Sequence, residues 1–325
     1  MGNPFLRVCN APFGIESLPI MGVCSSGSLP EIAGSGVDVD WSAVTFCSVS
    51  QMAAIACVQC AGTSSGVRQR CKLPDSKAKS YMLRMDYCRT LGIRAEEDFS
   101  RHDPRDRFVP LTKIPIDELE ADPGGIADRL EEVISANTML HRSASNMLNL
   151  AVTEVIDNVV QHSFAKSPGM ACAQYYANQG FVELCVADSG IGIPTSMADN
   201  PEYVFMTDWE RMLAAFDAEK GQWVGRPVTG SSQVGRGLGL SYPARLAERL
   251  GGHLWAISGD TAIHIHGGGR EPMDGLFYPG TVIVLRIPNV SDEVLESDLW
   301  DDGQPRPIYF DSVEGRNYGE DDWLW

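Results

Sequence analysis

The sequence has no long apolar run. Its longest candidate, residues 52–58, is far shorter than the ~20 residues that a membrane-spanning helix needs. The N-terminus also lacks the basic and then apolar pattern of a secretory signal peptide. These absences predict a cytoplasmic protein with no membrane partner.

Basic residues are scarce beside acidic ones. The chain has 26 Lys and Arg against 43 Asp and Glu, which gives a net charge of −17. Nucleic-acid binding needs cationic contacts to phosphate, so this balance argues against a direct nucleic-acid partner. Residues 291–325 alone hold eleven acidic residues and two arginines, a net charge of −9. We expect them to form an acidic tail, either solvated or used for docking.

The cysteines show no disulfide framework. There are nine, an odd number, and their spacing is irregular. Cys57 and Cys60 form one CxxC, but no second CxxC and no histidine at finger spacing accompany it. On a helix this pair is typical of packing. With 44% hydrophobic and 21% charged residues, the 325-residue chain is that of a globular protein with room for two domains.

Residues 153–163 read TEVIDNVVQHS and predict an amphipathic helix. Its apolar stripe recurs every three or four residues, at Leu148, Val152, Val155 and Val159. The other face is acidic and amide-bearing, with Glu154, Asp157, Asn158, Gln161 and His162. No Lys or Arg occurs from residue 143 to residue 165. Such a face suits a metal ion and an anion better than it suits plain solvent.

Glu154 and Asn158 lie one helical turn apart, an arrangement that metal-assisted phosphoryl chemistry can use. The amide oxygen of Asn158 is a hard ligand for Mg²⁺, and Glu154 can orient or deprotonate an acceptor. An E-x-x-x-N pair alone is common, so it becomes informative only together with other motifs.

Two glycine-rich segments follow this helix. Residues 181–187, FVELCVA, predict a strand that ends at Asp188 and continues as SGIGIP. Glycines there permit close approach of the backbone to a ligand, and a strand-end aspartate can accept a hydrogen bond from an exocyclic amine. The second segment, GRGLGL at residues 235–240, opens a predicted helix over 238–250. Free N–H groups at such a helix start favour phosphate.

Together, TEVIDNVVQHS, DSGIGIP and GRGLGL resemble the N-box and the two glycine boxes of the GHKL ATP-binding domain. That superfamily includes sensor histidine kinases, anti-sigma-factor kinases, type II topoisomerases, heat-shock chaperones and mismatch-repair ATPases. Gly280 and Thr281, followed by VIVLRIP, are similar to its closing strand. The resemblance covers about residues 137–288. It implies a C-terminal two-layer α/β sandwich (α+β, the Bergerat fold) that binds ATP and Mg²⁺.

The resemblance also implies a role for each motif residue. Glu154 would be the general base or would position the acceptor, Asn158 would bind Mg²⁺, and Asp188, with Thr281, would accept from the adenine amino group. The first glycine box contributes Gly190, Gly192 and Ile193, and the second contributes Gly235, Arg236, Gly237, Leu238 and Gly239 around the phosphates. Arg236 either reaches a phosphate or is simply exposed. His162 matches a histidine of anti-sigma kinases or is a packed side chain, and Asp157 either binds ATP or supports Asn158.

The remaining sequence predicts four segments. Residues 1–105 predict a small α/β domain, with strands at 44–46 and 67–73 and helices at 51–61 and 78–91; it resembles the STAS fold. The Asp-Ser pair of the STAS switch loop is missing after Phe46, so Ser48 and Ser50 would cap a helix instead of accepting phosphate. Residues 106–124 predict a linker and 125–290 the GHKL domain. Within the latter, 194–234 correspond to the ATP lid and 267–275 to a glycine-rich loop. Residues 291–325 are the acidic tail.

These features favour an ATP-dependent regulatory switch with slow ATP hydrolysis, in which the lid controls a protein partner or a homodimer. The alternative is an anti-sigma-type serine protein kinase. Self-phosphorylation on His141 is disfavoured because Arg142, not an acidic residue, follows it. A mechanical ATPase of the topoisomerase or chaperone type ranks last, since few residues follow Pro288 for a transducer domain.

Overall fold

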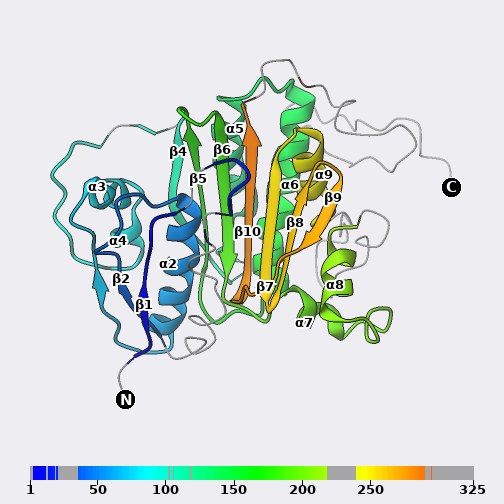
Figure 1. Cartoon of the computed structure of the whole chain (residues 1–325), viewed down its shortest axis with the longest axis horizontal. Coiled ribbons are helices and arrows are strands. Elements are labelled where there is room, and N and C mark those ends of the chain that lie inside the picture. The colour runs from blue at the N-terminus through cyan, green and yellow to red at the C-terminus, as the bar shows by residue number, and fades with distance from the viewer. Residues whose placement is uncertain are drawn as a thin grey trace.

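The computed structural model describes residues 3–11, 14–18, 20, 36–101, 103–104, 106–117, 119–217, 239–289 and 294. A seven-stranded antiparallel sheet occupies the middle of the molecule, with helices on both of its faces (Figure 1). In spatial order its strands are β4 (Phe108–Ile114), β5 (Gly169–Tyr176), β6 (Phe181–Asp188), β10 (Tyr278–Pro288), β7 (His253–Gly259), β8 (Thr261–His266) and β9 (Gly269–Pro272). The mixed α/β class predicted from the sequence is confirmed.

One face of the sheet carries the helices that follow the linker region. They are α5 (Pro123–Ser135), α6 (Arg142–His162), α7 (Ile193–Ala198), α8 (Asp208–Ala215) and α9 (Ser241–Arg249). The apolar stripe predicted for α6 is confirmed, because Leu148, Val152, Val155 and Val159 are all buried in this core. His141 is the N-cap of α6 and its Nδ1 accepts from the Ser143 N–H at 3.3 Å.

The opposite face is covered by the N-terminal segment. It forms a small parallel sheet, β1 (Phe5–Arg7), β2 (Asp38–Asp40) and β3 (Cys71–Lys72), with α2 (Val49–Ser64), α3 (Lys77–Arg84) and α4 (Tyr87–Thr90). Helix α2 lies against β5 and β6 and is buried almost all round, as expected for a helix between two layers. Ser48 caps α2 by accepting from Gln51 N–H at 3.1 Å, as predicted.

The strands of the large sheet serve two cores at once. Leu184 and Val186 of β6 face the α6 side, whereas Cys185 and Ala187 face the N-terminal segment. Every residue of β6 is therefore buried. The N-terminal segment shares a continuous core with the sheet, so it completes the third layer of the sandwich. Its resemblance to STAS stays a prediction.

The linker prediction is wrong for Phe108–Ile114, which form the edge strand β4. Pro110 suggested irregular chain, but it lies at a register shift between Val109 and Thr112, where an edge strand tolerates a residue without an N–H. Burial of Val109, Leu111 and Ile114 holds the strand in place.

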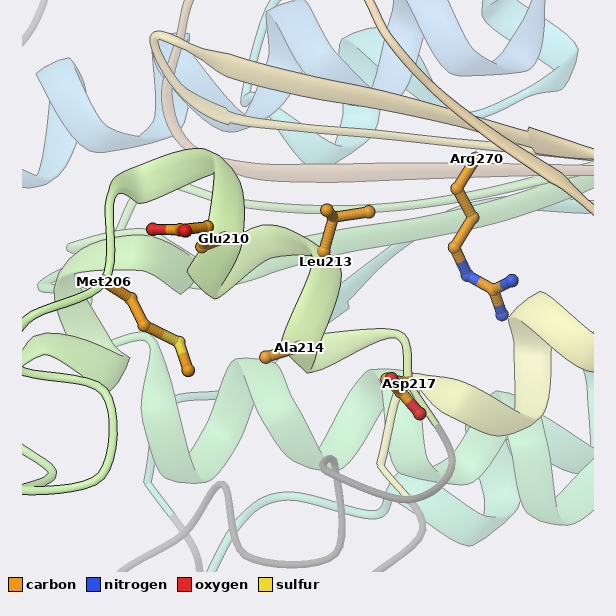
Figure 2. A pocket seen from close by; sticks show the side chains of 6 residues that line it. All are labelled: Met206, Glu210, Leu213, Ala214, Asp217 and Arg270. Atoms are coloured by element: carbon orange, nitrogen blue, oxygen red, sulfur yellow. The ribbon is translucent and has the colours of Figure 1, made fainter.

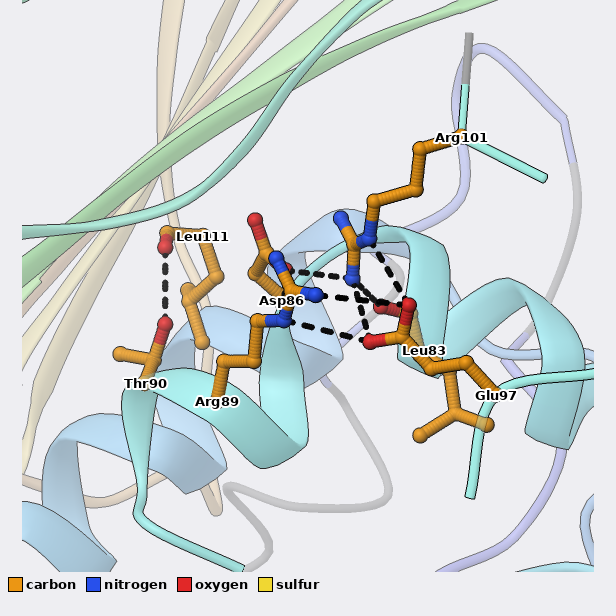
Figure 3. A network of polar contacts seen from close by, with 7 residues as sticks. All are labelled: Leu83, Asp86, Arg89, Thr90, Glu97, Arg101 and Leu111. Atoms are coloured by element: carbon orange, nitrogen blue, oxygen red, sulfur yellow. Dashed lines mark hydrogen bonds and ion pairs between the residues drawn. The ribbon is translucent and has the colours of Figure 1, made fainter. Parts of the chain in front are cut away.

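A polar network ties β4 to the N-terminal segment (Figure 3). Thr90 Oγ1 donates to the Leu111 carbonyl at 3.0 Å, and Leu111 N–H donates to the Met85 carbonyl at 2.9 Å. Arg101 lies 2.8 Å from carboxylate oxygens of both Asp86 and Glu97. The hydrogen bond from Arg101 is the main cause that lowers the pKa of Glu97. The segment that follows α4 is thus anchored to the sheet.

Three further elements differ from the sequence prediction. Residues 44–46 form no strand, since the strand of this region is β2 just before them. The helix expected over 78–91 is divided into α3 and α4 at Asp86, whose φ is 58°. The glycine-rich loop 267–275 contains β9, paired to β8. No helix in the described part of the chain is both long enough and apolar enough to cross a membrane.

Candidate nucleotide-binding site

The C-terminal end of α6 meets the glycine turn that follows β6. Ile191 N–H donates to the Ser163 carbonyl at 2.8 Å. A Cβ on Gly190 would lie only 1.9 Å from that carbonyl oxygen, so this position excludes any side chain. The first glycine box is therefore fastened to the end of the helix that carries Glu154 and Asn158.

This close approach predicts a large effect of a small substitution. Gly190→Ala must push the turn away from Ser163, and we expect it to lower the free energy of unfolding by about 1–3 kcal/mol. Gly124→Ala is the matched control, because nothing lies within 4 Å of a Cβ placed there. Urea unfolding of both variants measures the difference; equal stability would contradict the packing described here.

Asp188 lies at the end of β6, as predicted, and its side chain is buried. Gly190 N–H donates to its Oδ1 at 2.8 Å, and Thr281 is its partner across the β10 ladder. Burial raises the pKa of Asp188 to about 6, against the opposing hydrogen bonds from Gly190 and Thr281. A buried carboxyl group is thus held at the turn by hydrogen bonds from Gly190 and Thr281.

A serine that sequence reasoning missed organises the same turn. Ser258, at the end of β7, accepts from Ile193 N–H at 2.7 Å and lies 3.1 Å from Thr281 Oγ1. Its hydroxyl also lies 3.1 Å from the Gly280 carbonyl. Gly192 has a φ of +82°, and a Cβ there would lie 2.7 Å from Ser258 Oγ. The only sequence signal was the Ser-Gly pair before the β7–β8 turn, which is too common to indicate a site.

The polar face of α6 is half-buried at Glu154, Asp157, Asn158 and His162. Asn158 Nδ2 donates to the Glu154 carbonyl at 2.7 Å, so its amide oxygen is the atom available to a cation. Burial lowers the pKa of His162, which keeps this imidazole neutral at neutral pH. The oxygen-rich donor set of this face fits Mg²⁺.

Only part of the second glycine box can be described. Gly239 has a φ of +41° and leads through buried Leu240 into α9, which lies against α6. Gly235, Arg236, Gly237 and Leu238 lie outside the described residues. The described end of this box thus reaches the neighbourhood of the N-box helix.

The structure describes residues 194–217 of the predicted lid. Its helical patch, Trp209, Met212, Leu213 and Phe216, belongs to α8 and its C-cap, and Met212 and Phe216 are completely buried in the core. Of the two alternatives, docking over a nucleotide or packing on the domain, the structure shows packing for this patch. The remainder of the predicted lid, residues 218–234, lies outside the described residues.

A cavity of about 370 Å³ lies between α8 and β9 (Figure 2). Met206, Glu210, Leu213, Ala214, Asp217 and Arg270 line it. None of the described residues predicted to bind ATP is among them. Two of the lining side chains are acidic, and Arg270 is engaged by Glu248 at 3.2 Å. This cavity is therefore poorly suited to a triphosphate.

A comparison with protein families agrees with this geometry. Residues 144–291 match the family model described as histidine kinase-, DNA gyrase B-, and HSP90-like ATPase. The match spans α6 to the end of β10 and supports a GHKL-type ATP-binding domain in this part of the chain. No curated protein matches the sequence.

Proposed function

We propose that this protein binds MgATP at the junction of α6, the turn after β6 and the start of α9, and that it acts as an ATP-dependent regulatory switch. One observation carries the proposal. The buried Asp188 carboxyl lies at a glycine turn that is fastened directly to the C-terminal end of α6. A hydrogen-bond acceptor for adenine and an oxygen ligand for magnesium are thereby held on adjoining elements.

Each residue of the site has a role in this proposal. Asp188 accepts a hydrogen bond from the adenine amino group, and Thr281 lies beside it. Gly190, Gly192 and Ile193 form the part of the site that faces the adenine base. The Asn158 amide oxygen binds Mg²⁺, with Asp157 supporting it. Glu154 orients or deprotonates the acceptor, and His162 packs beside this face. We assign phosphate binding to the backbone N–H groups of Gly235, Gly237 and Gly239, with Leu238 in the same box and Arg236 as a further phosphate ligand.

The switch function is supported by the two-faced sheet. Strands β6 and β10 carry Asp188 and Thr281, and their other face packs on α2 of the N-terminal segment. Tyr278 OH donates to the Ala54 carbonyl at 3.0 Å, and Ser50 Oγ donates to the Glu183 carboxylate. In this proposal, a change in the turn upon nucleotide binding passes through these contacts to the N-terminal segment, which a protein partner or a second copy would contact.

The chemical outcome is tested with γ-labelled ATP, Mg²⁺ and the intact protein, alone and mixed with candidate partner proteins. We expect slow release of free phosphate, and we expect Glu154→Gln to bind ATP but to release none. Transfer of the label to another protein would show that the protein is a serine kinase and not an ATP-hydrolysing switch. Bound ATP with neither phosphate release nor transfer would leave a nucleotide-binding module without catalysis.

Nucleotide affinity should also depend on pH. Asp188 accepts from the adenine amine as a carboxylate, and its pKa is raised to about 6 by burial. Affinity should therefore rise with pH through 6 and be about 10-fold weaker at pH 5 than at pH 7. Ionisation of Asp188 disfavours the folded state, so its contribution to stability falls as pH rises from about 4 to above 6 in the protein without nucleotide.

Calorimetric titration of ATP over this range, with Asp188→Asn as the matched variant, checks this pH dependence. The variant should lose the dependence that belongs to the protein. If ATP affinity changes with pH equally in both proteins, the pH dependence comes from the nucleotide, and Asp188 does not bind the adenine amino group.

A further inference from the structure

Histidines gather on one face of the sheet, away from the proposed nucleotide site. The chain has six histidines, and three of them, His253, His264 and His266, lie on the neighbouring strands β7 and β8. The imidazole rings of His264 and His266 are 4.3 Å apart, and the ring of His253 lies 5.2 Å from His264 and 5.3 Å from His266. Half of the histidines in the protein thus form a single cluster.

The strand pattern places this cluster at the edge of the sheet. In the sequence Ile263-His264-Ile265-His266 the two isoleucines face the core on the α6 side, so both histidines point to the opposite face. Across the ladder, His264 is paired with Glu271 of β9. Glu271 is mostly exposed and His266 is partly exposed, so solvent can reach the cluster.

A set of metal-ligand atoms converges there. One ligand atom from each of His264, His266 and Glu271 lies within 4.8 Å of the other two, and His266 Nε2 is 3.7 Å from a carboxylate oxygen of Glu271. Zinc bonds of about 2.0–2.2 Å place ligand atoms roughly 3.5 Å apart, so small rotations of the two exposed side chains complete the set. Two imidazoles and one carboxylate are a donor set that divalent transition metals accept.

His253 supports this arrangement. Its Nδ1 lies 2.9 Å from His264 Nε2, and its ring is buried beneath the cluster and stacked on Trp255. A metal-binding histidine generally uses its second ring nitrogen for such an orienting hydrogen bond. Aromatic stacking explains the contact of His264 with Trp255, at 4.9 Å, but it does not explain a carboxylate placed opposite the histidines.

We propose that His264, His266 and Glu271 form a divalent transition-metal site for an ion such as Zn²⁺, with His253 as the residue that positions His264. The site joins strand β9 to β8 at the edge of the sheet and is separate from the Mg²⁺ ligands proposed on α6. It does not depend on the proposed ATP function.

The probe is Zn²⁺ alone, titrated by calorimetry into the intact, chelator-treated protein in excess Mg²⁺ without nucleotide. We expect one Zn²⁺ per chain. Affinity should fall at least 10-fold in Glu271→Gln and at least 100-fold in the double variant His264→Ala/His266→Ala. Because Glu271 is exposed, Glu271→Gln should fold normally even if the histidine variants do not. His141→Asn is the control, since it removes an imidazole elsewhere and keeps a helix cap.

Co²⁺ substitution gives a second readout, because its visible absorption reports ligation by nitrogen and oxygen. That absorption should be lost in the double variant and kept in His141→Asn. Zinc binding that is unchanged in Glu271→Gln and in the double variant, or absent from the parent protein, would overturn the proposal.

Discussion

Asn158→Ala should weaken MgATP binding by at least about 100-fold, and the loss should vanish when affinity is compared in the absence of Mg²⁺. The amide nitrogen of Asn158 donates to the Glu154 carbonyl at 2.7 Å, so its oxygen is the atom that we propose as the Mg²⁺ ligand. Without that oxygen, the protein would lose its direct ligand to the metal. It would therefore also lose the contact with the phosphates that the metal mediates. Calorimetric titration with ATP, with Mg²⁺ or with a chelator, separates the two contributions.

A second asparagine on the same helix provides the control. Asn149 is half-buried nearer the start of α6, and its Nδ2 donates to Asp128 of α5 at 2.7 Å. Asn149→Ala removes an amide of the same size but should leave MgATP affinity within a factor of two or three. If Asn158→Ala and Asn149→Ala behave alike, the metal assignment is wrong.

Arg286→Met should lower the free energy of unfolding by about 3–5 kcal/mol, because it leaves Glu183 as a buried carboxylate without its cation. Both side chains are completely inaccessible to solvent, and Arg286 NH2 is 2.7 Å from Glu183 Oε2. Arg286 also donates to the carbonyls of Gly14 and Ser17, and Ser50 donates to Glu183. The pair therefore joins the seven-stranded sheet to the N-terminal segment.

Urea unfolding measures this loss against two further variants. Arg270→Met breaks a partly exposed pair with Glu248 and should cost only about 0–1 kcal/mol. Replacing both members, in Glu183→Leu/Arg286→Met, should recover part of the stability, because two matched apolar groups replace a buried charge. An Arg286→Met protein as stable as Arg270→Met would show that the two layers are held together without this pair.

Much of the site could be predicted from the sequence because its signals are local. The 3.6-residue spacing of Leu148, Val152, Val155 and Val159 fixes which face of α6 is buried, and that places Asn158 on the other face. Asp188 follows an unbroken apolar strand and precedes two glycines, so its position at a strand end needed no knowledge of the fold.

The missed features depend on contacts between distant segments. Ser258 becomes important only because β7 ends beside Gly192, some 65 residues away in sequence. Strand β4 contains Pro110 at a register shift, and it forms a strand because it pairs with β5 and buries Val109, Leu111 and Ile114 against distant segments. Likewise, α2 carries apolar residues on every side, but nothing in the sequence indicates that one of its faces packs on the seven-stranded sheet.

We propose one nucleotide site at the end of α6 and the turn after β6, and a crystal structure with Mg²⁺ and a non-hydrolysable ATP analogue tests it most directly. We predict the adenine amino group within hydrogen-bonding distance of Asp188 and the metal bound to Asn158. A nucleotide found elsewhere, for example in the cavity between α8 and β9, with Asp188 and Asn158 untouched, would contradict it.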